Sequence, residues 1–237
     1  MKIALLGYGK MGHEVEKAAL TRQHKIIVTI DNESEWSERA PILKEADIAI
    51  DFSQPSQAVA NINRCFDFHI PVVVGTTAWY EHLDEIKQRC KTENQSLFYA
   101  PNFSIGMNIM FRLNKQLAKF AEQYGYQISL TETHHIHKLD KPSGTAVKIA
   151  NDIIATNKNY NSWSLEAKPE THILPITAIR EGEIFGIHSV QALSEADQIT
   201  LTHEAFSRKG LAQGAIAAAE FLIGKIGCYT MDDLFDK

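Results

Sequence analysis

The chain has 237 residues, 44% of them hydrophobic and 22% charged, which suits one large domain or two modest ones. A formal net charge of −5 argues against a basic surface for nucleic acid or anionic membranes. The sequence has no apolar run approaching the roughly 18 residues of a membrane span, and its N-terminus lacks the length and cleavage site of a signal peptide. Three cysteines, distant from one another and odd in number, argue against a disulfide framework. We expect a cytoplasmic protein whose thiols are structural or incidental.

The first hundred residues alternate between strand-like and helix-like patterns. Helical spacing at Met11–Leu20 and Ser56–Phe66 separates short apolar runs that are typical of strands buried on both faces. Such alternation predicts right-handed βαβ units and a parallel sheet. The predicted strands are Lys2–Leu6, Ile26–Ile30, Ile48–Phe52, Val72–Val74 and Leu97–Tyr99.

Beyond Pro101 the pattern changes. Ser104 can cap a helix to about Tyr124, whose apolar positions are Met110, Leu113, Leu117, Phe120 and Tyr124. A strand at about Gln127–Thr133 and a helix at about Ser143–Thr156 follow, then a polar loop at Asn157–Pro169. Three strands without intervening helices predict a partly antiparallel sheet, at His172–Ile179, Gly186–Ala192 and Gln198–Ala205. The chain then ends in an Ala-rich helix, about Leu211–Ile226, and a short acidic tail.

A G-x-G-x-x-G element follows the first predicted strand and opens the first predicted helix, which is the context that a dinucleotide-binding motif requires. It reads Gly7-Tyr8-Gly9-Lys10-Met11-Gly12. Its glycines permit a tight turn, close approach of the pyrophosphate and close packing of helix on strand, while the helix N-terminus presents free N–H groups to phosphate.

Asp31 ends the second predicted strand at the distance where the motif requires an acidic residue for the adenosine ribose. The alternative is that Asp31 only starts a turn with Asn32. Asp31 would repel a 2′-phosphate and Asn32 brings no compensating charge, so we expect NADH to be preferred over NADPH. Lys10 could partly restore NADPH binding.

Two further segments follow the fourth and fifth predicted strands, at the edge where ligands bind to open parallel sheets. They are Gly75-Thr76-Thr77 and Ala100-Pro101-Asn102-Phe103. We expect them to contact the nicotinamide half of the cofactor. The alternative is that both are ordinary turns at strand ends.

The segment Glu132–Ala146 combines three histidines and two lysines with Pro142-Ser143-Gly144-Thr145. Proline fits the start of a helix and serine its cap, so the unpaired N–H groups predict an anion pocket; a plain capping serine is the alternative. Because the segment lacks a P-loop pattern, we expect the bound anion to be a carboxylate. Alternation on an extended chain directs His135 and His137 one way and His134 the other. Because no Cys or carboxylate is spaced to complete a ligand set, we predict no metal site.

The segment Glu132–Ala146 closely resembles the signature of the 4-hydroxy-tetrahydrodipicolinate reductase family, and the resemblance covers nearly the whole chain. It extends to the two strand-end segments above, to Arg180-Glu181-Gly182, Gly186-Ile187-His188 and His203-Glu204-Ala205, and to the last helix with Tyr229–Asp232. The sequence departs from the family at Lys10 and Asn32, where Arg is common, and at Ala78, where Gly is usual. Its glycine loop is also slightly shorter.

The resemblance implies reduction of a conjugated cyclic imine dicarboxylate by hydride from NAD(P)H, in the diaminopimelate route to lysine. It implies that His134 is the proton donor and acceptor, Lys138 a second proton donor and His135 a substrate contact. It also implies that Gly144 and Thr145 bind a substrate carboxylate with Ser143 alongside, and that the protein is a homotetramer. From the residues alone, Arg180 pairs either with a carboxylate or in a surface or subunit salt bridge.

We therefore predict an α/β protein of two domains. A Rossmann-like, parallel-sheet nucleotide domain comprises residues 1–101 and 209–237, and a substrate and oligomerisation domain with a mixed sheet comprises residues 102–208. Two other functions fit the scaffold: a dehydrogenase of amino acids or imines, and a non-catalytic NAD-responsive binding protein. A sensor would have no use for His134 with Lys138, so these residues favour the enzyme.

Overall fold

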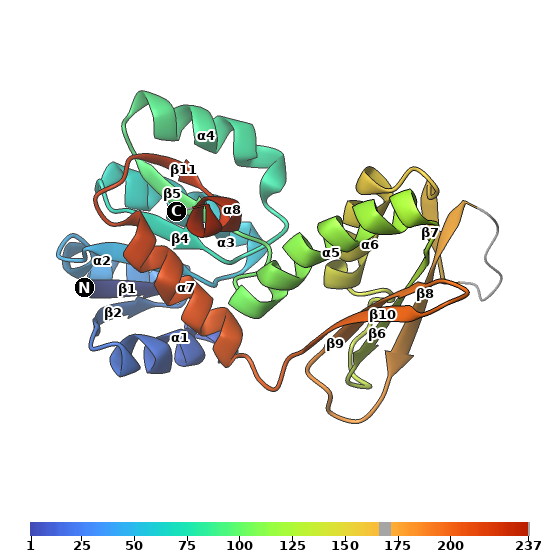
Figure 1. The fold of residues 1–237 in the computed structure, drawn as a ribbon. Helices are drawn as coiled ribbons and strands as arrows, with labels where there is room; N and C mark the ends of the chain where they lie inside the picture. Colours follow the sequence, from blue (N-terminus) through green and yellow to red (C-terminus); the bar gives the residue numbers. More distant parts are fainter. Residues whose placement is uncertain (166–171, 237) are drawn as a thin grey trace. The chain divides into compact units, whose positions relative to one another are not determined.

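The computed structural model describes residues 1–165 and 172–236, and it divides into two compact units. Unit 1 comprises Met1–Ile105 and Arg208–Lys237, and unit 2 comprises Gly106–Ser207. The chain thus leaves unit 1, builds unit 2 and returns. Figure 1 shows the elements of each unit in sequence colours.

Unit 1 is built on a six-stranded, entirely parallel sheet in the order β11-β5-β4-β3-β1-β2. Strands β1, β3 and β4 are mainly runs of Ile, Val, Leu and Ala that are buried on both faces, as parallel strands covered by helices must be. The five predicted strands are confirmed within two residues at each end. The strands are β1 (Lys2–Leu6), β2 (Lys25–Ile30), β3 (Ile48–Asp51), β4 (Val72–Val74), β5 (Ser96–Tyr99) and β11 (Gly227–Tyr229).

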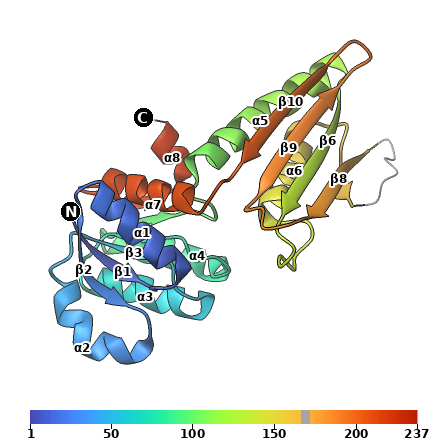
Figure 2. The ribbon, with the colours of Figure 1, turned by 90° about the horizontal axis from the view of Figure 1, so that it is seen from below.

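Helices cover both faces of this sheet, and each face has its own hydrophobic core. On one face lie α2 (Glu33–Leu43), α3 (Pro55–Asp67) and α4 (Leu83–Thr92), which follows a 3-10 turn at Tyr80–His82. On the other lie α1 (Lys10–Thr21), α7 (Lys209–Leu222) and α8 (Met231–Phe235). Figures 1 and 2 show both layers. This doubly wound arrangement is the Rossmann-like fold that the sequence predicts.

The end of the chain differs from the prediction. The last long helix stops at Leu222 instead of about Ile226, because Gly224 adopts a positive φ of 76° that helices do not accommodate. The supposed acidic tail supplies a sixth strand, β11, which pairs parallel with β5. It then forms the short helix α8, where Thr230 and Asp233 make a capping box.

Unit 2 has a mixed five-stranded sheet in the order β10-β9-β6-β8-β7. Its strands are β6 (Gln127–His134), β7 (Ser162–Ser164), β8 (Ile173–Arg180), β9 (Ile187–Leu193) and β10 (Gln198–Glu204). β9 pairs antiparallel with β6 and β10, whereas β8 pairs parallel with β6 and β7. The predicted loop at Asn157–Pro169 was partly wrong, because β7 lies within it; its last residues fall outside the described part of the chain.

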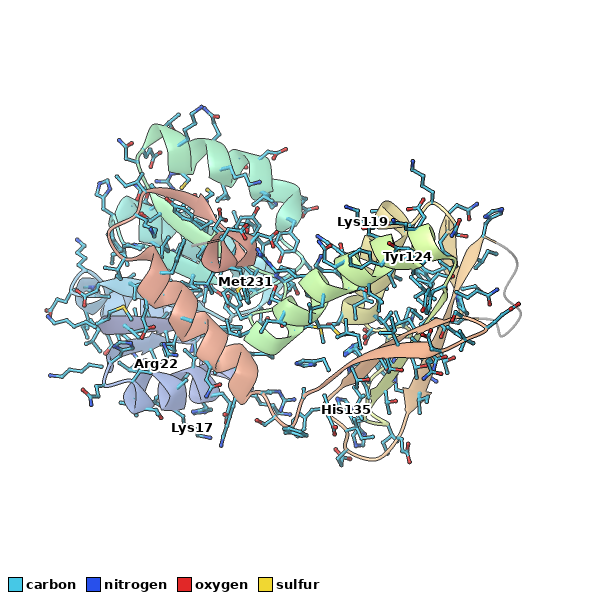
Figure 3. The ribbon with its side chains drawn as sticks, in the orientation of Figure 1. Lys17, Arg22, Lys119, Tyr124, His135 and Met231 are labelled. Atoms are coloured by element: carbon cyan, nitrogen blue, oxygen red, sulfur yellow. The ribbon has the colours of Figure 1, made fainter. Side chains whose placement is uncertain are left out.

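Two helices, α5 (Ile105–Tyr124) and α6 (Gly144–Thr156), pack on one face of this sheet (Figures 1 and 2). The predicted apolar stripe of α5 was wrong for most of its members. Leu113, Phe120 and Tyr124 are about half exposed or more, and Tyr124 is labelled in Figure 3. The buried stripe instead comprises Met107, Met110, Phe111, Asn114, Ala118 and Ala121. Small alanines let α5 lie close to the sheet, which spacing of large apolar residues does not reveal.

None of the helices in the described residues combines the length and apolar character needed to cross a bilayer.

Candidate functional site

In unit 1 the glycine loop joins β1 to α1. Gly7 has φ +86°, and a side chain there would meet the Phe52 carbonyl oxygen at 2.5 Å. A Cβ on Gly12 would lie 2.5 Å from the Gly7 carbonyl oxygen, so both residues must be glycine for the turn to close. Gly9 has no heavy atom within 4 Å of a Cβ position and caps α1 without a side-chain hydrogen bond. Only there is space left for a ligand to approach the backbone.

The side chains of this loop point to different places. Tyr8 is partly buried and donates its hydroxyl hydrogen bond to Glu16 of α1, so its ring is held against the helix. Lys10 is exposed and Met11 packs against the core on the α1 side of the sheet. Any phosphate contact from Tyr8 or Met11 would therefore come from backbone N–H groups.

Asp31 contacts the glycine loop directly. Its Oδ1 accepts a hydrogen bond of 2.5 Å from the Tyr8 N–H, and the residue is otherwise exposed. Asn32, in contrast, caps α2 by accepting from the Glu35 N–H. Asp31 is thus a partner of the loop, and the turn at Asn32 is a separate feature.

The segment after β4, Gly75-Thr76-Thr77, is held by hydrogen bonding to the buried Asp51. Oδ1 of Asp51 accepts from the Thr76 hydroxyl at 2.7 Å and from the Ser53 N–H at 2.9 Å, and its Oδ2 accepts from Asn61 at 2.8 Å. Burial raises the pKa of Asp51, while these hydrogen bonds oppose the shift. Both polar groups of Thr76 are hydrogen-bonded within the protein: the hydroxyl donates to Asp51, and the carbonyl oxygen accepts from Trp79 Nε1. Gly75 packs against the Phe52 ring and Thr77 is exposed.

The segment after β5, Ala100-Pro101-Asn102-Phe103, has two buried residues and two that solvent reaches. Ala100 and Phe103 are buried in the core, where the Phe103 ring lies 5.9 Å from Phe52. Pro101 is exposed, and Asn102 Oδ1 accepts from the Ser104 N–H at 2.9 Å. Ala100 and Phe103 therefore shape the strand end, and their side chains are directed away from solvent. Asn102 thus provides a side-chain acceptor just before α5.

These segments fit a dinucleotide. The glycine loop, Asp31, Thr76–Thr77 and Pro101–Asn102 all lie at the carboxyl ends of β1, β2, β4 and β5, one edge of the parallel sheet. The open space at Gly9 is where a pyrophosphate would reach the N-terminus of α1.

In unit 2, a buried polar cluster forms where β6 ends. Glu132 and His134 are two residues apart on the strand, so both side chains lie on the helix-covered face. The His134 ring contacts Glu132 Oε2 through Nδ1, and Arg180 Nη1 donates to Glu132 Oε1 at 2.8 Å. Burial alone would raise the pKa of Glu132, but the hydrogen bonds from His134 and Arg180 outweigh it and lower the value to about 2. Glu132 is thus an anion that orients His134.

His188 completes this cluster from the neighbouring strand. It lies opposite Glu132 in the antiparallel register of β9 with β6, and its ring is 5.1 Å from that of His134. Burial, then the charge of His134, lowers the pKa of His188 to about 4, so His188 is neutral. The Ser143 hydroxyl accepts from the Ala146 N–H and lies 3.3 Å from His188 Nε2, to which it can donate.

The loop after β6 carries Lys138. Its Nζ binds Asp140 Oδ1 at 2.9 Å, and this ion pair holds the pKa of Asp140 low. Arg180 fixes the same loop, because its guanidinium also donates to the carbonyl oxygens of Lys138 and Asp140. Arg180 is therefore an internal clamp that pairs with a buried carboxylate, as one of the two alternatives from the sequence expected.

The other two histidines leave the strand, because β6 ends at His134 and a turn follows. The rings of His135 and His137 are nevertheless 5.9 Å apart, on a common side. His137 pairs with the exposed Glu183 at 3.0 Å. Nδ1 of His135 is buried and has no hydrogen-bond partner among the described residues.

The N-terminus of α6 adjoins this cluster. Ser143 is its N-cap, and the Ser143 N–H donates to Glu132 Oε1 at 3.3 Å. Gly144 is exposed and Thr145 partly exposed, and their N–H groups have no acceptor in the described part of the chain. Pro142 precedes the cap, so the expectation of proline in the first turn was off by two positions. Two free amides at a helix N-terminus attract an anion.

The statement that no carboxylate could complete a metal site was wrong in geometry. Glu132, His134 and His188 each place a potential ligand atom within 4.8 Å of the others. Both Glu132 oxygens are, however, occupied by Arg180 and His134, and a guanidinium cation beside them disfavours a metal ion. The cluster is better suited to proton exchange than to metal binding.

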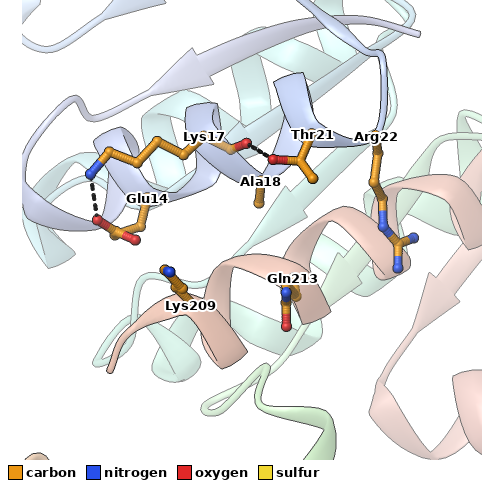
Figure 4. Close-up of a pocket in the computed structure, with 7 residues that line it drawn as sticks. All are labelled: Glu14, Lys17, Ala18, Thr21, Arg22, Lys209 and Gln213. Atoms are coloured by element: carbon orange, nitrogen blue, oxygen red, sulfur yellow. Dashed lines mark hydrogen bonds and ion pairs between the residues drawn. The ribbon is translucent and has the colours of Figure 1, made fainter. Parts of the chain in front are cut away.

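A pocket of about 240 Å³ lies elsewhere in unit 1, between α1 and α7 (Figure 4). Lys17 binds Glu14 there at 2.8 Å, and Thr21 donates to the Lys17 carbonyl. The pocket contains none of the predicted site residues.

Sequence reasoning assigned no role to Glu132 or His188 and left the partner of Arg180 open. Glu132 was detectable as the residue two positions before His134 on a strand. His188 was not, because only the register of β9 against β6 brings it there.

Comparisons with known proteins agree with this geometry. Models of the dihydrodipicolinate reductase N-terminus and C-terminus match residues 1–103 and 106–235. A 4-hydroxy-tetrahydrodipicolinate reductase from Christiangramia forsetii is 43% identical, with 99% of this chain and 97% of the relative covered. One from Staphylococcus aureus is 34% identical, with coverage of 99% and 100%.

Solved structures share the fold. A dipicolinate-bound dihydrodipicolinate reductase from Paenisporosarcina sp. TG-14 superposes with a TM-score of 0.78 at 21% identity, covering 97% of each chain. An amine dehydrogenase from Mycobacterium smegmatis gives 0.62 at 10% identity, covering 98% and 95%. The scaffold is thus shared with other dehydrogenases, whereas the matches over the full sequence are specific. The chain belongs to the dihydrodipicolinate reductase family.

Proposed function

We propose that the chain reduces 4-hydroxy-tetrahydrodipicolinate to tetrahydrodipicolinate with NAD(P)H, in the diaminopimelate route to lysine. The observation that carries the proposal is the buried Glu132–His134 pair beside the free amides of Gly144 and Thr145. A proton donor next to an anion pocket suits a dicarboxylate that gains a proton. The bound nicotinamide supplies the hydride.

The N-terminus of α6 binds one substrate carboxylate in this proposal. The amides of Gly144 and Thr145 donate to it, and Ser143 holds the turn through its bond to His188. The partly exposed imidazole of His135 and the ammonium of Lys138 provide further contacts to the substrate. Lys138 is only partly exposed and is held by Asp140, so a substrate carboxylate can replace Asp140 as its partner.

His134 holds and moves the proton. Because Nδ1 donates to Glu132, Nε2 is the ring nitrogen left for the substrate. Gly186 keeps that nitrogen accessible, since a side chain at this position would lie 2.9 Å from Nε2. Lys138 then stabilises negative charge as it develops, or donates the second proton.

NADH is the preferred cofactor in this proposal. The Tyr8 N–H occupies Oδ1 of Asp31, leaving Oδ2 as an acceptor for ribose hydroxyls. Glu33 and Glu35, in the first turn of α2, are paired with Arg64 and Arg39, so the repulsion of a 2′-phosphate comes mainly from Asp31 beside a neutral Asn32. Lys10 is the exposed cation in the glycine loop that could offset part of this repulsion.

The chain is expected to form a homotetramer through the open face of the unit 2 sheet, in a cytoplasmic setting. The helices occupy the other face (Figure 2). Strand alternation places mainly neutral residues on the open face, with the charged Glu204 at the end of β10, so most of the face can be buried without desolvating charges. They include Ser129, Thr131, Thr133, Thr177, Ile179, Ser189, Gln191, Leu193, Thr200 and Thr202.

The decisive assay follows NADH oxidation at about 340 nm while the preceding synthase makes substrate from pyruvate and aspartate semialdehyde. We expect substrate-dependent turnover that is lost in the double variant His134→Ala, Lys138→Ala. The single variant Lys138→Ala should lower turnover by about 10²-fold, the usual contribution of a positioned proton donor. Lys141→Ala, in the same loop but with no assigned role, is the matched control.

No turnover with either cofactor, together with measurable NADH binding, would contradict the proposal. Turnover of other imines or amino acids would then support a different dehydrogenase on this scaffold. NADH binding without any turnover would support a sensor.

A further inference from the structure

Cys90 and Cys228 are far apart in sequence but meet in unit 1. The carbonyl oxygen of Gln95 accepts from the Cys90 thiol at 3.1 Å and from the Gly227 N–H at 2.9 Å. Cys228, the next residue, lies beside Leu97 in the β11–β5 register and packs against the core cluster that contains Cys90. The Cys90 thiol and the backbone of β11 next to Cys228 thus share one hydrogen-bond acceptor.

The two thiols have different environments. The hydrogen bond from Cys90, and then the charge of Lys87 one turn earlier on α4, lower the pKa of Cys228 despite its partial burial. The same hydrogen bond and burial raise the pKa of Cys90. Cys228 is partly exposed and Cys90 is fully buried. A partly exposed thiol with a lowered pKa therefore adjoins a buried thiol with a raised pKa.

We propose that Cys90 and Cys228 are a redox-active pair that hydroperoxides convert into a disulfide joining α4 to β11. The Cys228 thiolate attacks one peroxide oxygen, the O–O bond breaks, and the leaving alkoxide is protonated to an alcohol. Cys228 is now a sulfenic acid. The Cys90 sulfur attacks the Cys228 sulfur, the S–O bond breaks, and the departing hydroxide takes the Cys90 proton as water. The two thiols lose two electrons and two protons, which the hydroperoxide accepts.

The position of the pair gives the disulfide a structural effect. Cys90 precedes unit 2 in the chain and Cys228 follows it, so the bond would close a loop that contains all of Gly106–Ser207. β11 has only three residues and pairs with β5 alone, at the edge of the sheet. Oxidation would attach this short edge strand covalently to α4. Long closed loops restrict the unfolded chain most.

The test uses the full-length reduced protein treated with a small excess of hydrogen peroxide, followed by intact mass and peptide mapping. Wild type and the control Cys65→Ser should lose two hydrogen atoms, about 2 Da, and recover them with dithiothreitol. Cys90→Ser should stop at a Cys228 sulfenic acid that dimedone traps. Cys228→Ser should not lose the hydrogens.

Two measurements on wild type do not depend on how the variants fold. Iodoacetamide should label Cys228 at least about tenfold faster than Cys90 or Cys65, because Cys228 is partly exposed with a lowered pKa, whereas the other two thiols are buried with raised pKa values. The oxidised protein should melt about 5–10 °C above the reduced one, as a long closed loop requires.

Equal labelling rates, a disulfide between two chains, or accumulation of Cys228 sulfinic acid in wild type without a Cys90–Cys228 bond would overturn the proposal. None of these readouts involves the proposed reductase activity, so either proposal can fail without the other.

Discussion

Arg180 binds Glu132 through a 2.8 Å contact between Nη1 and Oε1, with 9% and none of the two side chains exposed. The same guanidinium donates to the Lys138 and Asp140 carbonyls, while the same carboxylate holds His134. One buried ion pair therefore positions both residues to which the family resemblance assigns proton transfer. Breaking such a pair from one side leaves an uncompensated charge.

Glu132→Gln should lower kcat by about 10–100-fold, because a neutral amide no longer holds the charge and tautomer of His134. The dinucleotide segments lie in unit 1, so the KM for NADH should not change. Steady-state kinetics of this variant measure both. Glu183→Gln removes the exposed partner of His137 and is the matched control, for which we expect near-normal kcat. Equal losses in the two variants would remove Glu132 from this role.

The two variants Gly9→Ala and Gly12→Ala should have different effects: the first on NADH affinity and the second on the stability of unit 1. A methyl at Gly9 meets no protein atom and its φ of −78° suits alanine, so stability should change by less than about 0.5 kcal/mol. NADH affinity should fall about tenfold or more, because the methyl occupies the approach of the pyrophosphate. Gly12→Ala should instead destabilise unit 1 by about 1–3 kcal/mol through its contact with Gly7.

Thermal unfolding and NADH fluorescence titration of both glycine variants check this. Unchanged NADH affinity in a stable Gly9→Ala protein would place the pyrophosphate elsewhere.

Asp31→Ala should weaken NADH binding more than NADPH binding, because the variant loses a ribose acceptor and also a repulsive charge. The affinities of the two cofactors, measured by titration at one ionic strength, give the ratio. Glu38→Ala, an exposed acid on α2, is the control. Equal losses for both cofactors would mean that Asp31 only holds Tyr8.

His188 makes unit 2 sensitive to acid. Its folded pKa of about 4 lies below the ordinary 6.5, so between these values the unfolded chain binds the proton and the folded one does not. Its effect is therefore absent above pH 6.5, and stability is lost progressively as the pH falls towards 4. His188→Gln removes this loss, worth about 3 kcal/mol at most.

The difference in unfolding free energy between wild type and His188→Gln should thus shift in favour of the variant from pH 7 to pH 4. Hydrogen exchange of β9 peptides in urea, at several pH values, reports on unit 2 separately. A difference that is constant with pH would refute the argument.

Ser189→Lys tests the proposed tetramer. Ser189 lies opposite Thr131 and Thr202 on the open sheet face, so a lysine there would put a charge into the contact. Light scattering after gel filtration should show smaller particles for this variant than for wild type. Gln123→Lys, on an exposed turn of α5, should leave the mass unchanged.

Much of unit 1 was predictable because parallel strands buried on both faces are continuous apolar runs, and the glycine loop has a fixed relation to strand and helix. The α5 stripe was mispredicted because its buried face combines large apolar residues with Asn114, Ala118 and Ala121, which the spacing of large apolar residues does not reveal. β11 was missed because three residues, Gly-Cys-Tyr, carry no strand periodicity and form a strand only by adding to the edge of β5.

The sequence by itself determined the family, the order of elements and the segment that holds His134, Lys138 and the N-terminus of α6, since these depend on local spacing and capping. Only the tertiary structure decided which groups surround His134. His188 and Arg180 reach Glu132 across strands whose register is set by packing of the whole sheet, and Cys90 meets Cys228 because β11 returns to the sheet after unit 2. Such pairings join residues far apart in the chain, where no local pattern carries the information.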